Sequence, residues 1–270
     1  MALLEGKTVL VTGILTDQSL AFSIAQRAQL EGATVIATGF GRGLSLTRRV
    51  LRKLPEEPEL VELDVTDEAQ LAAAAQRVGE LTDRLDGLVH AIGFAPPDCL
   101  GDGMLTASAS DVAMAFQISS YSLAALCRSF LPLLRAAEGA SVVGLDFDAT
   151  VAWPLYDWMG PTKAALESIV RYLARDLGAR RVRVNSLAAG PLETIAARAV
   201  SSFEGLKDAW GHVAPLKWDS SDATPVADAA VFLLSDLARG VTGEMLHVDG
   251  GFHSQGGAPA QLRPPEAPVQ

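Results

Sequence analysis

The chain has 270 residues and is 49% hydrophobic, which is enough apolar material for one large α/β domain with a substantial core. Its formal net charge of −10 at pH 7 argues against a nucleic-acid partner, and no apolar run is long enough to span a membrane. Two cysteines, Cys99 and Cys127, and four histidines show neither a disulfide framework nor a metal-ligand spacing, so we expect a cytoplasmic protein without a metal site.

Short apolar or β-branched runs alternate with helical patterns along the chain. The sequence predicts strands over residues 7–12, 33–38, 59–64, 85–92, 140–145, 181–187 and 244–248, and helices over residues 19–30, 44–54, 67–81, 110–135 and 156–178. This alternation is typical of a parallel sheet with right-handed crossovers. We therefore predict an α/β fold, a single-domain Rossmann-type doubly wound parallel sheet of about seven strands with helices on both faces.

The alternating pattern assigns residues 1–253 to this domain. Within it, residues 191–218 form a long and weakly patterned segment, which is typical of a substrate-binding loop or lid. Residues 254–270 are rich in glycine and proline, and we expect them to form a flexible C-terminal tail.

The first predicted strand runs into TGILTDQSLAF, where Gly13 permits a tight turn and the next helix can offer free backbone N–H groups to a phosphate. The spacing differs from G-x-G-x-x-G, so a structural turn with Ser19 as N-cap is the alternative. After the second and third strands, Phe40 could pack on an adenine and Asp64 could bind its amino group, with a loop aromatic and a turn carboxylate as alternatives. Arg42 could accommodate a 2′-phosphate, so NADH and NADPH both stay open.

Tyr156 and Lys163 lie seven residues apart at the start of the pattern 156–178. Two helical turns separate them by roughly 10 Å, a gap that a nucleotide ribose would fit. The alternative is one buried tyrosine and one surface lysine. Because proline is tolerated in the first turn of a helix, we expect regular geometry to begin only shortly before Pro161, or the helix to bend there.

These segments resemble the short-chain dehydrogenase/reductase superfamily, and within it most closely the bacterial NADH-dependent enoyl-acyl-carrier-protein reductases. The matching pieces are LVTGILTDQSLAF, LDV, AIGFAP, ISSYSL, YDWMGPTKAALE, RVNSLAAGPLET and VTGEMLHVDGG. They cover the chain from Leu4 to His253. The variant glycine loop and YDWMGPTK are more specific to this subgroup than a Tyr/Lys pair is to the superfamily.

Two absences favour this subgroup over carbonyl reductases. Many carbonyl-reducing relatives carry a serine about thirteen residues before the tyrosine and an asparagine in the fourth helix. Here Val143 takes the serine position, and the helix reads QISSYS. Without these hydrogen bonds a ketone reductase would lack the groups that position a developing alkoxide, so reduction of a carbon–carbon double bond is favoured.

The resemblance implies hydride transfer from NADH to the β-carbon of a trans-2-enoyl thioester in fatty acid biosynthesis. Tyr156 would donate a hydrogen bond to the thioester oxygen, and Lys163 would bind the nicotinamide ribose. Phe147 matches an aromatic position near the reacting bond, with a core phenylalanine as the alternative. Glu193 stands where we expect an arginine or a neutral residue, which puts the electrostatics near the cofactor phosphates in question.

The resemblance also implies the remaining contacts. The residues expected at the cofactor are Gly13, Ile14, Ser19, Leu20, Phe40, Asp64, Val65, Ile92, Gly93, Ile118, Lys163, Ala189, Gly190, Pro191, Leu192 and Thr194. The residues expected at the substrate are Phe94, Tyr156, Met159 and Ala196, and for the apolar ones a place in the core is the alternative.

The expected partner is a thioester of acyl carrier protein or coenzyme A, and the family is commonly tetrameric through its fourth and fifth helices and its last strand. Two other functions stay open. One is a short-chain reductase of another conjugated or ketone substrate in a secondary pathway, and the other is a nucleotide-binding scaffold without turnover.

Overall fold

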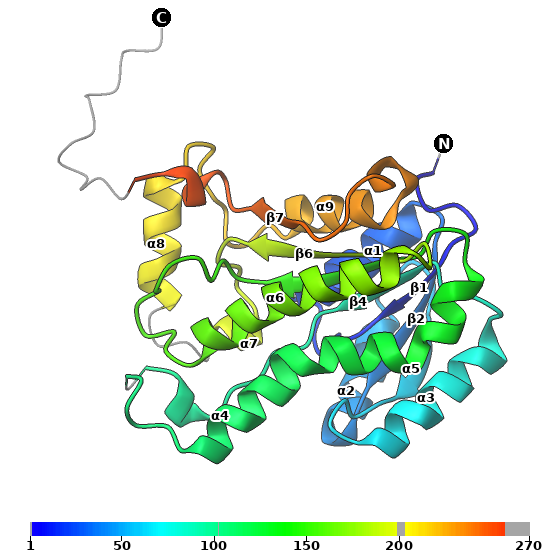
Figure 1. Ribbon diagram of the computed structural model, residues 1–270. Helices are drawn as coiled ribbons and strands as arrows, with labels where there is room; N and C mark the ends of the chain where they lie inside the picture. Colours follow the sequence, from blue (N-terminus) through cyan, green and yellow to red (C-terminus); the bar gives the residue numbers. More distant parts are fainter. Residues whose placement is uncertain (1, 102, 199–202, 257–270) are drawn as a thin grey trace, which may run out of the picture.

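A computed structural model of the chain describes residues 2–101, 103–198 and 203–256 (Figure 1). In this part of the chain seven strands form one parallel sheet in the order β3-β2-β1-β4-β5-β6-β7. The strands are β1 (Thr8–Val11), β2 (Thr34–Gly39), β3 (Glu59–Glu62), β4 (Gly87–His90), β5 (Ser141–Asp146), β6 (Arg183–Ala189) and β7 (Met245–Val248). The predicted Rossmann-type fold is therefore confirmed.

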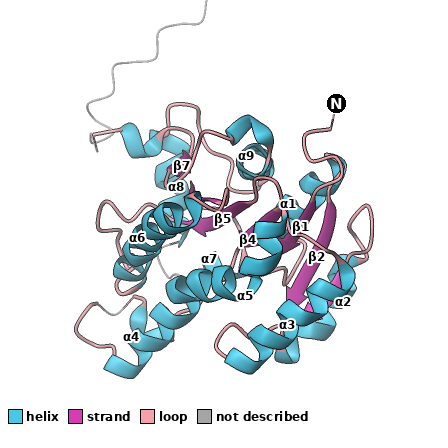
Figure 2. Ribbon diagram, turned by 45° about the vertical axis from the view of Figure 1, so that its right-hand side comes forward, coloured by secondary structure: helices cyan, strands magenta, loops and turns pink. Residues whose placement is uncertain are grey.

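Helices cover both faces of the sheet (Figures 1 and 2). The described helices are α1 (Leu20–Leu30), α2 (Leu44–Leu51), α3 (Glu68–Leu81), α4 (Ala109–Phe116), α5 (Ser122–Ala136), α6 (Met159–Gly178), α7 (Ile195–Arg198), α8 (Phe203–Val213) and α9 (Thr224–Leu234). Residues of α1, α2 and α9 share one hydrophobic core, and residues of α3, α5 and α6 share the other. Along β1 the side chains alternate between the two cores, because Val9 and Val11 pack in the first and Leu10 in the second.

The strand order places the carboxyl ends of β1 and β4 side by side at the point where the chain changes direction across the sheet. Ligands of open parallel sheets bind at such a switch point. Helices α4, α7 and α8 gather at this end of the sheet (Figure 1). The segment predicted as a binding loop, residues 191–218, thus contains α7 and α8, and residues 199–202 lie outside the described residues.

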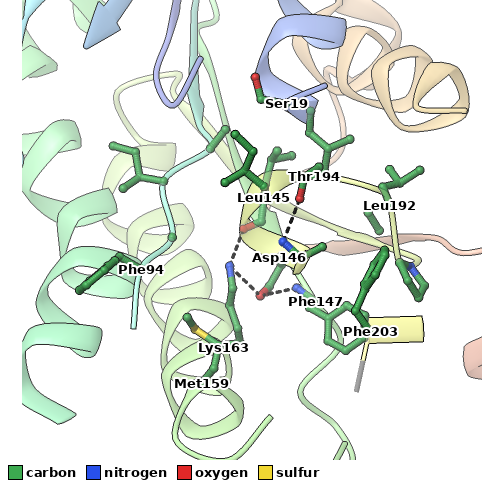
Figure 3. Close-up of a pocket in the computed structure, with 18 of the residues that line it drawn as sticks. Ser19, Phe94, Leu145, Asp146, Phe147, Met159, Lys163, Leu192, Thr194 and Phe203 are labelled. Carbon is green, nitrogen blue, oxygen red and sulfur yellow. Dashed lines mark hydrogen bonds and ion pairs between the residues drawn. The ribbon is translucent and has the colours of Figure 1, made fainter. Parts of the chain in front are cut away.

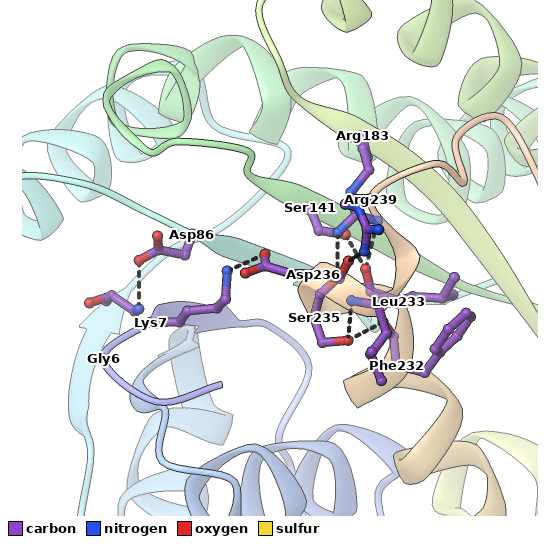
Figure 4. A network of polar contacts seen from close by, with 12 residues as sticks. Gly6, Lys7, Asp86, Ser141, Arg183, Phe232, Leu233, Ser235, Asp236 and Arg239 are labelled. Carbon is purple, nitrogen blue, oxygen red and sulfur yellow. Dashed lines mark hydrogen bonds and ion pairs between the residues drawn. The ribbon is translucent and has the colours of Figure 1, made fainter. Parts of the chain in front are cut away.

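A polar network fastens α9 to the opposite end of the sheet (Figure 4). Arg183 begins β6 and is 9% exposed, and its guanidinium donates to the carbonyls of Leu233 (2.8 Å) and Ser235 (3.1 Å). A positive charge at the last carbonyls of a helix also interacts favourably with the helix dipole. On the surface side of the network, Lys7 pairs with Asp236 at 2.9 Å.

Three helical segments need comment. Helix α6 begins at Met159, so Pro161 falls in its first turn as expected, but Tyr156 precedes the helix and does not lie on its face. The helix predicted over 110–135 is interrupted by a π-helical turn, Gln117–Tyr121. Helix α9 was not predicted, because it packs against both α1 and the sheet and so shows little polar periodicity.

Asp67 caps α3 by accepting from the backbone N–H groups of Ala69 and Gln70. Among the described helices, each is too short or too polar to cross a membrane. The predicted flexible tail, residues 254–270, falls mostly outside the described residues, which end at 256.

Candidate active site

A cavity of about 540 Å³ opens at the carboxyl ends of β1, β4, β5 and β6 (Figure 3). Its volume and mainly apolar wall suit a cofactor and substrate site. Many of the predicted site residues line it: Ser19, Leu20, Ile92, Gly93, Phe94, Phe147, Tyr156, Met159, Lys163, Ala189, Gly190, Pro191, Leu192 and Thr194. Segments far apart in the sequence thus meet at one hollow.

Lys163 reaches the cavity from the second turn of α6. Its Nζ donates to the carbonyl of Leu145 at 2.8 Å and lies 3.8 Å from Asp146 Oδ1, while its side chain is 10% exposed. Burial lowers the pKa of Lys163, and the charge of Asp146 opposes this shift. The lysine is therefore a nearly buried ammonium group held at the rim of the cavity by β5.

Tyr156 sits in a strained turn that precedes α6. Leu155 (φ 58°) and Asp157 (φ 40°), on either side of it, both adopt the left-handed region that non-glycine residues rarely enter. The Asp157 carboxylate offsets the cost of this backbone strain by accepting from the backbone N–H groups of Gly101 (2.7 Å) and Gly103 (3.1 Å). Burial, with a smaller effect of the Asp146 charge, raises the pKa of Tyr156, so its phenol stays protonated at neutral pH.

Phe147 forms the wall behind the phenol. Its ring lies 5.2 Å from that of Tyr156 in an edge-on arrangement, and 5.3 Å from that of Trp153. Trp210 of α8 stacks on Phe252 with their ring centroids 3.7 Å apart, and both rings lie beside Trp153. This aromatic cluster shields one side of the cavity from water and holds Phe147 in place.

The first β–α turn fits a phosphate group. Gly13 has φ 83°, and a Cβ at this position would lie 2.0 Å from the carbonyl oxygen of Ala91. Ser19 occupies the N-cap position of α1, but its hydroxyl donates to the carbonyl of Thr16 and makes no cap bond. Ser19, Leu20 and Ala21 line the cavity, so the first turn of α1 faces it with N–H groups that no side chain caps.

The segment after β6 closes the cavity from another side. A Cβ on Gly190 would lie 2.7 Å from the ring of Trp218, whose Nε1 donates to the carbonyl of Pro191 at 2.7 Å. Glu193 accepts from Lys207 Nζ of α8 at 3.0 Å and from Ser220 Oγ at 3.3 Å. The unexpected acid is thus paired with a lysine, which also lies 3.1 Å from Glu204 Oε2.

Sequence comparisons point to one family. Residues 13–253 match the family described as enoyl-(acyl carrier protein) reductase. The chain is 42% identical to the enoyl-acyl-carrier-protein reductase (NADH) of Mycolicibacterium smegmatis over 94% of this chain and 98% of that protein. It is 38% identical to the FabI enzyme of that name from Aquifex aeolicus, over 95% and 94%, and 35% identical to that from Escherichia coli, over 93% and 96%. The chain belongs to the enoyl-(acyl carrier protein) reductase family.

Some residues predicted for a reductase of this family lie off the cavity wall. Gly13 and Ile14 lie behind it in the first turn; Ile14 is buried, and its carbonyl accepts from Thr47 Oγ1. Phe40 is 57% exposed beyond β2, and Asp64 Oδ1 accepts from Thr66, the turn role weighed as its alternative. The others are Val65, which is buried after β3, and Ile118, which lies in the π-helical turn. The side chain of Ala196, in α7, lies outside the described residues.

Sequence reasoning assigned no role to several residues that the reductase fold brings to the cavity. Asp146, next to Phe147, is the main one, and its position at the end of β5 was the available signal. Leu100 lines the cavity because Asp157 holds the neighbouring backbone, a contact across 56 residues. Asp148 does not line the cavity; it accepts from the backbone N–H of Thr150 at 2.9 Å and lies 3.8 Å from His247 Nε2.

A buried polar pair lies at the end of β4 in this reductase. His90 Nε2 is 2.7 Å from Ser122 Oγ, and the hydroxyl of Ser122 donates to the carbonyl of Ile118 in the π-helical turn. Burial, together with the positive charge of Lys163, lowers the pKa of His90 to about 3. His90 is therefore neutral at physiological pH and adds no charge beneath Lys163.

Proposed function

We propose that this protein is an NADH-dependent enoyl-thioester reductase of fatty acid biosynthesis, which reduces the carbon–carbon double bond of a trans-2-enoyl group on acyl carrier protein or coenzyme A. The observation that carries the proposal is the convergence of Tyr156, Lys163 and Phe147 on one cavity, with Val143 where a carbonyl reductase needs a serine. The relatives from three bacteria, which are named NADH-dependent reductases, support NADH as the cofactor.

The cavity fits a dinucleotide. The uncapped first turn of α1 suits a pyrophosphate, and Gly190, whose lack of a side chain lets Trp218 and Trp210 pack against it, lines the cavity after β6. Lys163 offers an ammonium group to a ribose. Once bound, the reduced nicotinamide supplies a hydride to the β-carbon of the substrate.

Tyr156 stabilises the charge that develops on the substrate. When the β-carbon gains a hydride, electrons move onto the thioester oxygen and an enolate forms. The phenol keeps its proton because burial raises its pKa, so it donates a hydrogen bond to that oxygen. A proton from water then reaches the α-carbon, directly or by way of the enol oxygen, and the saturated thioester leaves. Phe147 and the tryptophans behind it exclude water from this face.

The test follows NADH absorbance with crotonyl and longer enoyl thioesters. NADH binding without oxidation by any enoyl thioester would contradict the proposal. Tyr156→Phe should lower turnover while NADH binding is kept, because the phenol acts on the substrate; Tyr172→Phe, the same substitution at an exposed tyrosine of α6, is the matched control. Lys163→Ala should chiefly weaken NADH binding, with the exposed Lys53→Ala as control.

Three further expectations belong to the same proposal: residues 1–253 form the reductase domain, the protein acts in the cytoplasm, and it assembles as a homotetramer. Large apolar side chains exposed along α4 and the π-helical turn support assembly, namely Met114, Phe116 and Tyr121. Light scattering that gives a monomer at working concentration would refute the tetramer.

A further inference from the structure

Asp146 ends β5 inside the cavity wall with an unusual environment (Figure 3). Its side chain is 0% exposed, and Oδ1 accepts from the backbone N–H of Phe147 at 2.9 Å. The other oxygen, Oδ2, is buried without a hydrogen-bond partner among the described residues. A buried carboxylate with one free oxygen is costly, so its retention beside a reaction site calls for a functional explanation.

The charge of the Asp146 carboxylate acts on Lys163, the nearest cation. Lys163 Nζ lies 3.8 Å from Asp146 Oδ1, and it donates to the carbonyl of Leu145, the neighbouring residue on β5. An ammonium group has three N–H donors. With the carbonyl and the carboxylate on the β5 side, the remaining hydrogen-bonding capacity of Lys163 is directed to the cavity.

We propose that Asp146 is the positioning residue of Lys163, whose carboxylate keeps the ammonium group charged and fixed at the cavity and thereby sets the affinity for the cofactor. The inference rests on the proposed function, because it takes the nicotinamide cofactor as the ligand of Lys163. Both side chains are nearly excluded from water, so their attraction is weakly screened by salt.

Among the titratable groups around the pair, Asp146 is the one that keeps Lys163 charged. Burial lowers the pKa of Lys163, and Asp146 is the charge that raises it. Glu167 of α6 and Asp148 of the following loop act on Asp146 as like charges, and Tyr156 and His90 are neutral at physiological pH. Asp146→Asn keeps the shape and an acceptor for Phe147 N while it removes the charge from Lys163.

The experiment measures NADH binding by isothermal titration calorimetry at increasing pH above 7, where Asp146 is ionised because its pKa is about 7. Wild-type binding should weaken when Lys163 loses its proton. This fall of NADH affinity at high pH is the alkaline limb of the binding profile. In Asp146→Asn the alkaline limb should move to lower pH by about 1–3 units, since an opposite charge within about 4–6 Å shifts a pKa by that amount. Asp148→Asn, which removes a buried acid two residues further along the chain, should leave the limb in place. An unmoved limb in Asp146→Asn would overturn the proposal.

A double-mutant cycle separates positioning from a direct or structural role. If Asp146 acts through Lys163, adding Asp146→Asn to Lys163→Met should change the NADH dissociation constant less than about twofold. An equal loss of affinity in both backgrounds would refute the inference. Asp146→Ser, which retains a hydroxyl acceptor, replaces the asparagine variant if thermal unfolding shows that the latter does not fold.

This outcome is independent of turnover. A protein that binds NADH with the expected pH profile but reduces no enoyl thioester contradicts the proposed function and leaves the role of Asp146 intact. A protein that reduces enoyl thioesters but shows an unmoved alkaline limb in Asp146→Asn contradicts the role of Asp146 and leaves the proposed function intact.

Discussion

Replacing Arg183 by methionine tests whether the fastening of α9 to β6 contributes to stability without affecting the site. The change removes two hydrogen bonds from a buried charge to the carbonyls of Leu233 and Ser235 (Figure 4). Both carbonyls keep another donor, because Ser141 Oγ binds the first and Ala238 N binds the second. Neither acceptor is left unpaired, and the unbranched methionine side chain fills much of the vacated volume.

The size of the effect follows from these contacts. A hydrogen bond from a charged group contributes about 1.5–3 kcal/mol, and a charge at a helix C-terminus contributes about 0.3–1 kcal/mol. Relief from burying the guanidinium, whose pKa burial lowers, offsets part of this sum. We therefore expect Arg183→Met to reduce the free energy of unfolding by roughly 2–3 kcal/mol, which lowers Tm by roughly 4–12 °C for a domain of this size.

The assay is urea unfolding followed by circular dichroism, with Lys7→Met as the control. Lys7 belongs to the same network, but its partner Asp236 has a side chain 75% exposed, so this pair should contribute less than about 1 kcal/mol. Arg183 and Ala189 lie at opposite ends of β6, roughly 20 Å apart, so NADH affinity should not change. Equal stability of the two variants, or a loss of NADH affinity in Arg183→Met, would refute the reasoning.

Three further outcomes are expected. Gly190→Ala should cost about 1–3 kcal/mol of stability and weaken NADH binding in calorimetry, because its Cβ would displace Trp218. Asp157→Ala should raise KM for the enoyl thioester more than it lowers kcat, because the loop it holds lines the cavity; an unchanged KM would contradict this. The pKa of His90 is about 3 in the folded chain, so its contribution to stability is greatest above pH 6.5 and falls as the pH drops toward 3. The pKa of Asp146 is about 7 in the folded chain, so its contribution is greatest below about pH 4 and falls as the pH rises toward 7. Each contribution changes by about 1.4 kcal/mol per pH unit inside its own window. Asp146→Asn should therefore make urea stability fall more steeply than in wild type as the pH drops below 6.5.

The sequence predicted the layers of the fold and the centre of the site because both depend on local patterns. Alternating strands and helices imply a parallel sheet whose carboxyl ends meet, and the family resemblance implied that Phe147 and Lys163 lie at the site; both line one cavity at these strand ends. The start of α6 was also foreseeable from Pro161, since a proline in the first turn of a helix costs no intrahelical hydrogen bond.

The contacts that tune the site could not be predicted, since they join residues that local patterns do not connect. Asp157 binds a backbone more than fifty residues away, and Glu193 meets Lys207 only because α8 returns over the segment after β6. The orphaned oxygen of Asp146 depends on burial that a sequence does not display. The expected adenine contacts of Phe40 and Asp64 stay predictions.

The packing around Gly190 gives the protein an optical property. Two of its four tryptophans, Trp210 and Trp218, surround this glycine, and a third, Trp153, lies beside Phe147. Indole emission overlaps the absorption band of a reduced nicotinamide but not that of an oxidised one. Ultraviolet light absorbed by these indoles can therefore pass to a bound reduced cofactor, and the unlabelled chain would report both the occupancy and the redox state of its own cavity.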